Sequence, residues 1–533
     1  MKRALLFLAT LLLCASTLRG QHTTSIAIAE GEYWWGLATD LGCQMPFDGA
    51  TLLSLDHRTQ NLNNQTTPLL LSNTGRYIWC EGPMMCTISG GVLEISSGRG
   101  EIVEGVAEER SLRGAYKAAC AKFFPSSGTT PPAEFFSQPQ YNTWIELTYN
   151  QNQADVMAYA EGIVSNGYPT GVLMIDDNWQ KYYGNFEFRP GRFPDPKGMI
   201  DRLHEMGFKV MLWISPFVSP DSAEYRDLAK RGFLLKKADK FGNTSPAIVE
   251  WWNGYSAVYD LSNPAAFAHL KGVLEEMQRE YGVDGFKFDG GDPERYPEGV
   301  VSPYDGCSYD VEQTELWAKL ALEFPYNELR ACWQMGGEAL VQRLGDKDYS
   351  WDDVAKLVPS MVAAGLLGHL YTCPDMIGGG QWLSFEGVNA ENIDQRLVVR
   401  SCQIHSMMPM MQFSVAPWRI LSPENNAICQ KYAKWHASLG AYILSLARHA
   451  AATGEPIVRH MAYEFPGEGF EHCIDQYMLG DRYLVAPIMG PEDSRTVKLP
   501  RGEWRDDQGK SYKGGRTYTI DVSIDRLLWF EKM

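Results

Sequence analysis

The stretch YGVDGFKFDGGD (281–292) runs through apolar and β-prone residues and then stops on an aspartate and two glycines. Residues 283–288 predict a short buried strand, and Gly290 and Gly291 supply the turn that ends it. Asp289 then lies where the strand leaves the core. A charge at that place needs solvent, a partner or a substrate, because an unpaired buried carboxylate is costly.

Strands and helices alternate on both sides of this stretch. Such alternation implies parallel pairing of the strands, and it predicts a (β/α)₈ TIM barrel over residues 136–450. The expected strands are GVLMID (171–176), FKVMLWI (208–214), GFKFD (285–289) and RACWQ (330–334), and the expected helices lie at 196–207 and 263–281.

The sequence on either side of the barrel has a different texture. Residues 22–135 contain short apolar runs broken by turn residues, which predict an N-terminal β-sandwich domain that ends in a Ser- and Pro-rich connector (126–140). Residues 451–533 return to β patterns without room for helices, and they predict a C-terminal β-sandwich domain. The expected fold class is α/β, a TIM barrel flanked by two β-sandwich domains.

Residues 1–21 have the layout of a secretory signal peptide, because Lys2 and Arg3 precede a short apolar core. A lipoprotein anchored at Cys14 is the less favoured alternative, since Leu13 lies where a small residue is required. No later segment has the roughly 18 uninterrupted apolar residues of a membrane span. The sequence predicts an exported protein, periplasmic or extracellular, with no integral membrane segment.

Composition narrows the classes of partner. The 533 residues carry a formal net charge of −17, which argues against nucleic acid or an anionic membrane as the main partner. The 16 Trp and 26 Tyr residues either pack in the core or offer flat faces to sugar rings. Because no C-x-x-C pair is present, no metal is expected, although Cys80 and Cys86 could form a disulfide in an oxidising compartment. The oligomeric state stays open.

Several predicted strands end in carboxylates, namely Asp176, Asp177, Asp289 and Asp375. In a TIM barrel the carboxyl ends of the strands meet over one cavity, although each aspartate could instead cap a helix or hold a turn. Carboxylates gathered with Trp, Lys and Arg favour hydrolysis of glycosidic bonds, which needs one carboxylate at the anomeric carbon and another that protonates the leaving oxygen. His405 lacks a companion at i+4, so it is expected in the core or on a helix surface rather than as a metal ligand.

Longer motifs extend from this stretch over roughly residues 140–505. They are GFKFDGGD, RLGDKDYSWDD (343–353), WWNGYSAVYDLSNP (251–264), CIDQYMLGDRYLVAPIM (473–489), IDDNW (175–179) and QFSVAPWR (412–419). Together they resemble glycoside hydrolase family 31, whose members are retaining α-glycosidases with a (β/α)₈ barrel between β-sandwich domains. The likeness is greatest to the α-galactosidase-like subgroup of that family.

The resemblance implies two catalytic carboxyl groups. Asp289 matches the nucleophile, which forms a covalent glycosyl ester and leads to net retention. Asp346 matches the general acid and base, and it must be protonated before the bond breaks. Asp348 is the competing candidate, and Lys347 stands where the family usually has Asn. A retaining mechanism requires the two carboxyl groups to lie about 5–5.5 Å apart.

The resemblance also implies a set of side chains that bind the sugar. Trp252 would stack on the apolar face of the ring, Arg330 would contact the sugar, and Asp375 would hold Arg330 in place. Trp213 and Trp418 are weaker aromatic candidates. The full substrate-binding set is Asp176, Asp177, Trp252, Lys287, Arg330, Arg343 and Asp375.

The expected function is that of a retaining exo-acting α-glycosidase, in the first place an α-galactosidase, that requires no cofactor. Its partner is an oligosaccharide or glycoside substrate and not nucleic acid. Four alternatives stay open: an α-glucosidase or an α-xylosidase of the same family, a transglycosidase, and a non-catalytic carbohydrate-binding homologue. One or two hydrogen bonds distinguish an axial from an equatorial hydroxyl, so likeness alone does not identify the sugar.

Overall fold

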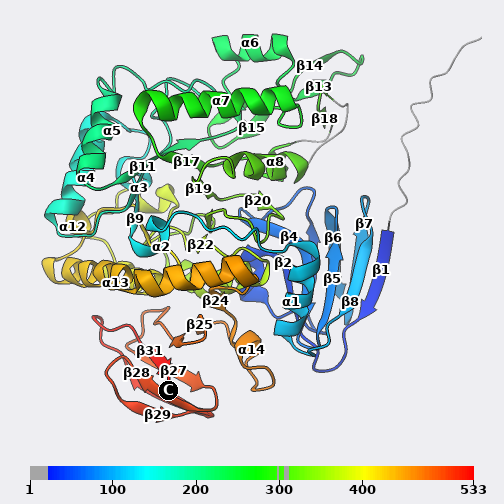
Figure 1. Cartoon of the computed structure of the whole chain (residues 1–533), viewed down its shortest axis with the longest axis vertical. Coiled ribbons are helices and arrows are strands. Elements are labelled where there is room, and N and C mark those ends of the chain that lie inside the picture. Colours follow the sequence, from blue (N-terminus) through cyan, green and yellow to red (C-terminus); the bar gives the residue numbers. More distant parts are fainter. Residues whose placement is uncertain (1–21, 297–298, 305–310) are drawn as a thin grey trace, which may run out of the picture.

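A computed structural model describes residues 22–296, 299–304 and 311–533 of the chain. The predicted signal peptide (1–21), with Cys14, lies outside the described residues. Figure 1 shows three parts: N-terminal strands in blue, a central barrel with its helices from cyan to yellow, and C-terminal strands in red. The long helix α13 (Pro423–Thr453) lies between the barrel and the C-terminal strands.

The central part is a parallel barrel whose strands follow one another in chain order around the ring. A bridge between Met376 and Gln412 connects its two ends, so the ring is nearly closed. The TIM-barrel prediction is confirmed. The eight strands are β9 (Gln140–Asn142), β10 (Val172–Ile175), β11 (Lys209–Ile214), β17 (Gly285–Phe288), β19 (Tyr326–Leu329), β21 (Gln342–Arg343), β22 (Thr372–Cys373) and β23 (Gln412–Phe413).

Helices connect most of the successive strands of the ring. They include α3 (Trp144–Leu147), α4 (Gln153–Ser165), α5 (Pro196–Glu205), α7 (Pro264–Tyr281), α8 (Val311–Ala321), α9 (Trp351–Val354), α10 (Leu357–Leu366), α11 (Gln395–Ser406) and α12 (Pro417–Ile420). Helix α7 begins where the side chain of Asn263 accepts a hydrogen bond from the Ala265 amide, and it ends at Gly282 in the left-handed conformation. Among the described residues, no helix combines the length and apolarity needed to cross a bilayer.

One predicted barrel strand was misplaced. The fifth strand is Tyr326–Leu329, whereas the predicted RACWQ segment contributes β20 (Cys332–Trp333), which pairs in parallel with β4 of the N-terminal part. Gln65 of β4 connects the N-terminal sheet to this segment and to the end of β21, because its side-chain amide donates to the carbonyls of Arg330 and Arg343 at 2.7 Å each. The chain therefore leaves the barrel one residue after β19.

The N-terminal part consists of two antiparallel sheets. One sheet contains β1 (His22–Ala27), β7 (Val92–Ser97), β6 (Met84–Ser89) and β3 (Leu53–Asp56), and the other contains β2 (Trp34–Ala38), β4 (Gln65–Ser72), β5 (Arg76–Cys80) and β8 (Ile102–Val106). Cys80 and Cys86 are free thiols on strands of different sheets, so the suggested disulfide is absent.

The sequence pattern suggested that residues 22–135 are all β, but the structure has two α-helices that begin among them. Helix α1 (Leu112–Phe123) packs against β4 and β5, and the shorter α2 (Glu134–Ser137) follows in the connector. Ser111 starts α1 by accepting a hydrogen bond from the Gly114 amide. The apolar runs that read as strands thus include a capped helix.

The C-terminal part is also built from β-sheets. A six-stranded sheet contains β24 (Val458–Arg459), β25 (Tyr477–Leu479), β26 (Tyr483–Val485), β31 (Trp529–Lys532), β28 (Glu503–Asp506) and β29 (Ser511–Lys513), and β27 (Ser494–Leu499) pairs with β30 (Arg516–Asp521). A short helix, α14 (Met461–Glu464), interrupts the segment EPIVRHMAYEF, where only strands were expected. The ring nitrogen of His460 caps this helix by accepting from the Ala462 amide.

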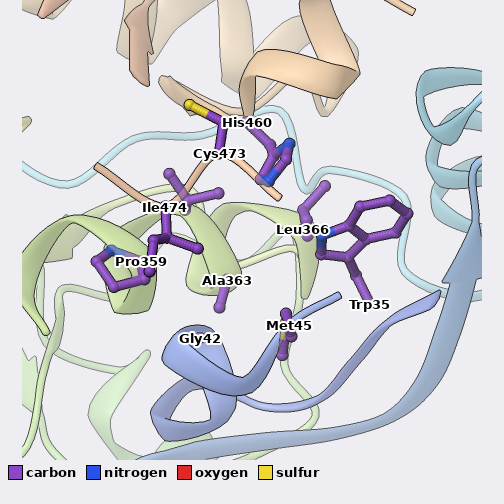
Figure 2. A pocket seen from close by; sticks show the side chains of 10 residues that line it. Trp35, Gly42, Met45, Pro359, Ala363, Leu366, His460, Cys473 and Ile474 are labelled. Atoms are coloured by element: carbon purple, nitrogen blue, oxygen red, sulfur yellow. The ribbon is translucent and has the colours of Figure 1, made fainter. Parts of the chain in front are cut away.

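The three parts meet at a small apolar cavity of about 10 Å³ (Figure 2). Trp35, Gly42 and Met45 come from the N-terminal part, Pro359, Ala363 and Leu366 from α10, and His460, Cys473 and Ile474 from the C-terminal part. The rings of Trp35 and His460 meet edge to face at 5.5 Å, and burial lowers the pKa of His460 to about 3. The junction is therefore packed like a core, with a neutral imidazole.

Candidate active site

A cleft of about 370 Å³ opens at the carboxyl ends of the barrel strands. All but one of the residues predicted to act in catalysis or substrate binding line it. These are Asp176, Asp177, Trp252, Lys287, Asp289, Arg330, Arg343 and Asp346. The exception, Asp375, is fully buried beside Arg343.

The opening motif explains how Asp289 reaches the cleft. Its amide donates to the carbonyl of Ile214 on β11 at 2.9 Å, so it is the first residue beyond strand β17. Gly290 and Gly291 then turn the chain with φ of 70° and 76°. A Cβ atom at either glycine would lie 2.8 Å from an aromatic ring, so the turn requires glycine for both conformation and space.

Positive charge surrounds the carboxylate of Asp289. Arg330 Nε donates to Oδ1 at 3.0 Å and Trp213 Nε1 donates to Oδ2 at 2.9 Å. Burial alone raises the pKa of Asp289, but Arg330, Lys287 and Arg343 outweigh it and hold this pKa well below its usual range. Asp289 is therefore ionised at neutral pH, as a nucleophile must be.

Asp346 is the more accessible of the two carboxyl groups. Its side chain is 30% exposed, and Oδ1 accepts a hydrogen bond from Arg343 at 2.7 Å. Asp348 is exposed and does not line the cleft, which favours Asp346 of the two candidates. The unusual Lys347 is buried, and its ammonium group donates to the Gly345 carbonyl within the same loop.

Asp375 holds Arg343 and not Arg330, contrary to the prediction. The Asp375 and Arg343 side chains meet at 2.5 Å, and the Lys347 amide donates to the other oxygen of Asp375. Arg330 is held instead by Asp292, through two hydrogen bonds of 2.7 Å. Asp292 is the last residue of GFKFDGGD, so the motif that contains the expected nucleophile also contains the partner that sequence reasoning missed.

The N-terminal part completes this network. The side-chain oxygen of Asn63 accepts from Arg330 at 2.6 Å, and Asn61 donates to Asp292 at 2.9 Å. Asn64 accepts from the Gly345 amide at 2.6 Å. No local pattern indicated that a loop from another part of the chain would enter the barrel, so sequence reasoning missed these three residues.

Asp176 and Asp177 lie at the end of β10 and differ in their partners. Asp176 pairs with Lys287 at 2.7 Å, and both side chains are buried. Asp177 Oδ2 accepts from Asn253 at 2.7 Å and from Tyr183 at 3.2 Å, whereas its buried Oδ1 has no hydrogen-bond partner among the described residues. Burial, followed by the charge of Asp176, raises the pKa of Asp177 to about 7.

Aromatic rings form the walls of the cleft. Trp252 is 41% exposed and lies on the tip of a hairpin formed by β15 (Val249–Trp251) and β16 (Gly254–Val258). Trp144, Tyr149 and Trp382 also line the cleft, although the sequence did not single them out. Trp213 belongs to the site through its bond to Asp289. Trp418, the other weaker aromatic candidate, is not among the residues that line the cleft.

Two further predictions concern residues outside the cleft. Trp418 packs against Tyr159 and Tyr168 on the outside of the barrel, so it is not a sugar platform. His405 is fully buried with neither ring nitrogen hydrogen-bonded, and burial lowers its pKa to about 3. His405 thus lies in the core, one of the two places expected for it.

The sequence matches known families and relatives. Residues 136–446 match the Glycosyl hydrolases family 31 TIM-barrel domain, and residues 454–532 match the family 31 C-terminal domain. The chain is 32% identical over 431 residues to the "Myogenesis-regulating glycosidase" of Mus musculus, covering 78% of this chain and 59% of that protein. It is 28% identical over 417 residues to an "Alpha-xylosidase" of Emericella nidulans, covering 73% and 51%. The chain thus spans little more than half the length of these relatives.

The fold also matches solved structures. A GH31 dextranase of Flavobacterium johnsoniae, complexed with glucose, aligns with a TM-score of 0.82 at 19% identity, covering 96% of this chain and 66% of that chain. That likeness concerns the fold alone. The match to the family 31 barrel domain, by contrast, covers more than half of the sequence. The chain belongs to glycoside hydrolase family 31.

Proposed function

We propose that this protein is a retaining, exo-acting α-glycosidase. The observation that carries the proposal is the pairing of an ionised carboxylate, Asp289, with a more exposed one, Asp346, in a single cleft. Asp289 lies among three cations at the closed end, whereas Asp346 is accessible from the cleft, where a leaving group would depart. Their expected separation of about 5–5.5 Å stays a prediction.

The reaction proceeds in two displacements. Asp289 attacks the anomeric carbon and forms a glycosyl ester, while Asp346 gives its proton to the leaving glycosidic oxygen. Water then attacks the same carbon, transfers its proton to Asp346 and releases Asp289. Arg330 and Trp213 return to their hydrogen bonds with the freed carboxylate, which favours release of the product.

The closed end of the cleft favours recognition of a terminal sugar. Lys287 and Asp289 are 4% and 9% exposed, whereas Trp252 and Leu383 at the mouth are 41% and 57% exposed. The terminal sugar ring of a substrate would occupy the buried end, and the rest of the substrate would occupy the mouth.

We favour α-linked galactose as this terminal sugar. Its axial C4 hydroxyl and its C6 hydroxymethyl group project from the same face of the ring, where two adjacent carboxyl groups are able to bind both. Asp176 and Asp177 form such a pair at the end of β10, and both line the cleft. Likeness to the α-galactosidase-like subgroup also supports this choice.

A panel of 4-nitrophenyl α-glycosides tests the proposal. Purified protein is expected to release nitrophenol from the galactoside, and proton NMR of the first sugar product should show the α-anomer. The Asp289→Asn variant should lose activity, because the amide is a poor nucleophile. Turnover of the glucoside alone would remove the galactose assignment. An Asp289→Asn variant as active as the parent would favour a binding protein whose apparent activity has another source.

The role of Asp346 has a separate signature. Asp346→Asn should lower kcat/KM, which reports the first displacement alone, about 10²–10⁴-fold on substrates whose leaving group needs a proton. The loss should be much smaller for 4-nitrophenyl glycosides, since nitrophenolate leaves without protonation. The same substitution at Asp348 is the matched control and should change neither. Equal losses on both kinds of substrate would argue against Asp346 as the acid.

An α-xylosidase is the second candidate, because one of the relatives carries that name. Xylose lacks the hydroxymethyl group at C5, so a xylosidase should reject galactosides by crowding at the closed end of the cleft. The same panel decides between the two. Product analysis at high acceptor concentration distinguishes a hydrolase from a transglycosidase.

A further inference from the structure

The cations that line the cleft are not equally neutralised. Three of the four form ion pairs: Lys287 with Asp176, Arg330 with Asp289 and Asp292, and Arg343 with Asp346 and Asp375. Within the part of the chain that the structure describes, the side chain of the fourth, Arg295, makes no ion pair and no hydrogen bond, and its Nε is buried without an acceptor. A buried donor of this kind is satisfied when a ligand supplies the acceptor.

Arg295 lies at the mouth of the cleft. It ends the short 3₁₀ helix η2 (Pro293–Arg295), directly after the GFKFDGGD motif, and its guanidinium carbon lies 5.8 Å from the ring centroid of Trp252. Trp252 is 41% exposed, whereas Lys287 at the closed end is 4% exposed. A substrate whose terminal sugar occupies the closed end therefore presents its next unit to Arg295.

We propose that Arg295 binds an anionic group, a carboxylate or a sulfate, on the part of the substrate beyond the scissile bond. The orientation of the substrate rests on the proposed exo-acting glycosidase function. A guanidinium group offers a planar fork of donors that fits two oxygens of such an anion. The ring of Trp252 limits the approach to one side. The natural substrates are thus acidic α-glycosides.

The overall charge of the protein makes the preference specific. With a net charge of −17, the molecule as a whole repels anions, so general attraction does not bring an acidic substrate to the cleft. In the described ranges, the nearest carboxylate along the chain, Glu294, attracts Arg295 only weakly and is not ion-paired with it. A preference for anions must therefore come from a local contact.

The test uses three α-glycosides that differ only at one position of the aglycone: 4-carboxyphenyl, 4-sulfophenyl and the neutral 4-carbamoylphenyl galactosides. The ratio of kcat/KM for an anionic to the neutral substrate is the readout. In Arg295→Gln this ratio should fall about tenfold, the effect of one lost charge-assisted contact, whereas Arg295→Lys should keep part of it. Arg279→Gln, an exposed arginine on α7, is the matched control and should keep the full ratio.

Binding is measured separately by calorimetric titration of the Asp289→Asn variant with the carboxyphenyl and carbamoylphenyl galactosides. If turnover or binding shows the same anionic-to-neutral ratio in the parent and in Arg295→Gln, the proposed role of Arg295 is wrong. The proposed hydrolase function is not affected by that result. Binding that prefers the anion, together with no turnover of any α-glycoside by the parent, overturns the proposed hydrolase function alone. Weakening of the anionic preference by added salt supports a charge contact.

Discussion

Asp177 is the residue in the cleft whose charge state changes most readily. One of its oxygens is held by Asn253 and Tyr183, and the other is buried without a partner. Its neighbour Asp176 has a cation, Lys287, within 2.7 Å, whereas Asp177 has none. Burial, followed by the charge of Asp176, raises the pKa of Asp177 to about 7, and Lys287 pairs with Asp176 and not with Asp177.

The stability of the protein should therefore depend on pH through Asp177. Its folded-state pKa is raised from 3.8 to about 7, so the stability that its bound proton provides is present below pH 4 and is lost as the pH rises towards 7. The Asp177→Asn variant does not titrate. The difference in unfolding free energy, variant minus parent, should be larger at pH 8 than at pH 4 by up to about 4 kcal/mol.

Urea unfolding of both proteins at pH 4, 6 and 8 measures this difference. The exposed Thr517 provides the control, since its side chain does not titrate and Thr517→Ala should give a difference that is the same at each pH. A flat difference for Asp177→Asn as well would show that the carboxyl group is ionised throughout this range.

At the scale of elements, the hairpin β15–β16 carries Trp252, the proposed sugar platform, and Asn253 at its tip ties it to the cleft. Asn253 at the hairpin tip donates to Asp177 at 2.7 Å and to Tyr183 at 2.8 Å, and it accepts from Tyr149 at 2.7 Å. Trp252 precedes it in the chain, so the position of its ring over the cleft depends on this anchor. The hairpin is extended by the two-residue strand β12 (Phe217–Val218), which pairs with β16.

Replacing Asn253 by alanine should loosen Trp252 without touching Asp289. We expect KM for the glycoside to rise about three- to tenfold, the effect of losing about one hydrogen bond's worth of binding, with little change in kcat. Steady-state kinetics measures the split. Tyr255→Ala removes an exposed ring from the same hairpin and should leave both constants near the parent values. Equal falls in kcat for both variants would mean that the hairpin acts in the chemical step.

At the scale of the whole molecule, the barrel does not form its active site alone. The loop with Asn61, Asn63 and Asn64 crosses from the N-terminal sheets to bind Asp292, Arg330 and the Gly345 amide. Its position depends on how the N-terminal part packs on the barrel. The 3₁₀ helix η1 (Thr39–Gln44) rests on α10 next to the cavity of Figure 2, where Gly42 lies against Pro359.

Gly42 allows this close approach. A Cβ atom there would lie 2.4 Å from the backbone oxygen of Pro359, so Gly42→Ala must push the two parts aside. The free energy of unfolding should fall by about 1–3 kcal/mol, as in an overpacked core, and kcat should fall with it if the asparagine loop shifts. Gly191→Ala, at an open position with no atom within 4 Å, should change neither value in denaturant unfolding and activity assays. An unchanged Gly42→Ala protein would show that the junction is loose.

Local patterns in the chain were enough to locate the strand that ends at Asp289, the helix at 263–281 and the alternation of strands and helices in the barrel. Each of these depends on residues that are neighbours in sequence, through side-chain periodicity, turn conformation or capping. The ion-pair partners of the charged residues and the pairing of distant segments could not be predicted in this way. Whether Asp375 holds Arg343 or Arg330, whether Cys332 and Trp333 join the barrel or the N-terminal sheet, and whether an asparagine loop enters the site all depend on contacts between segments far apart in sequence. Such contacts result from packing of the whole chain, and no short-range pattern encodes them.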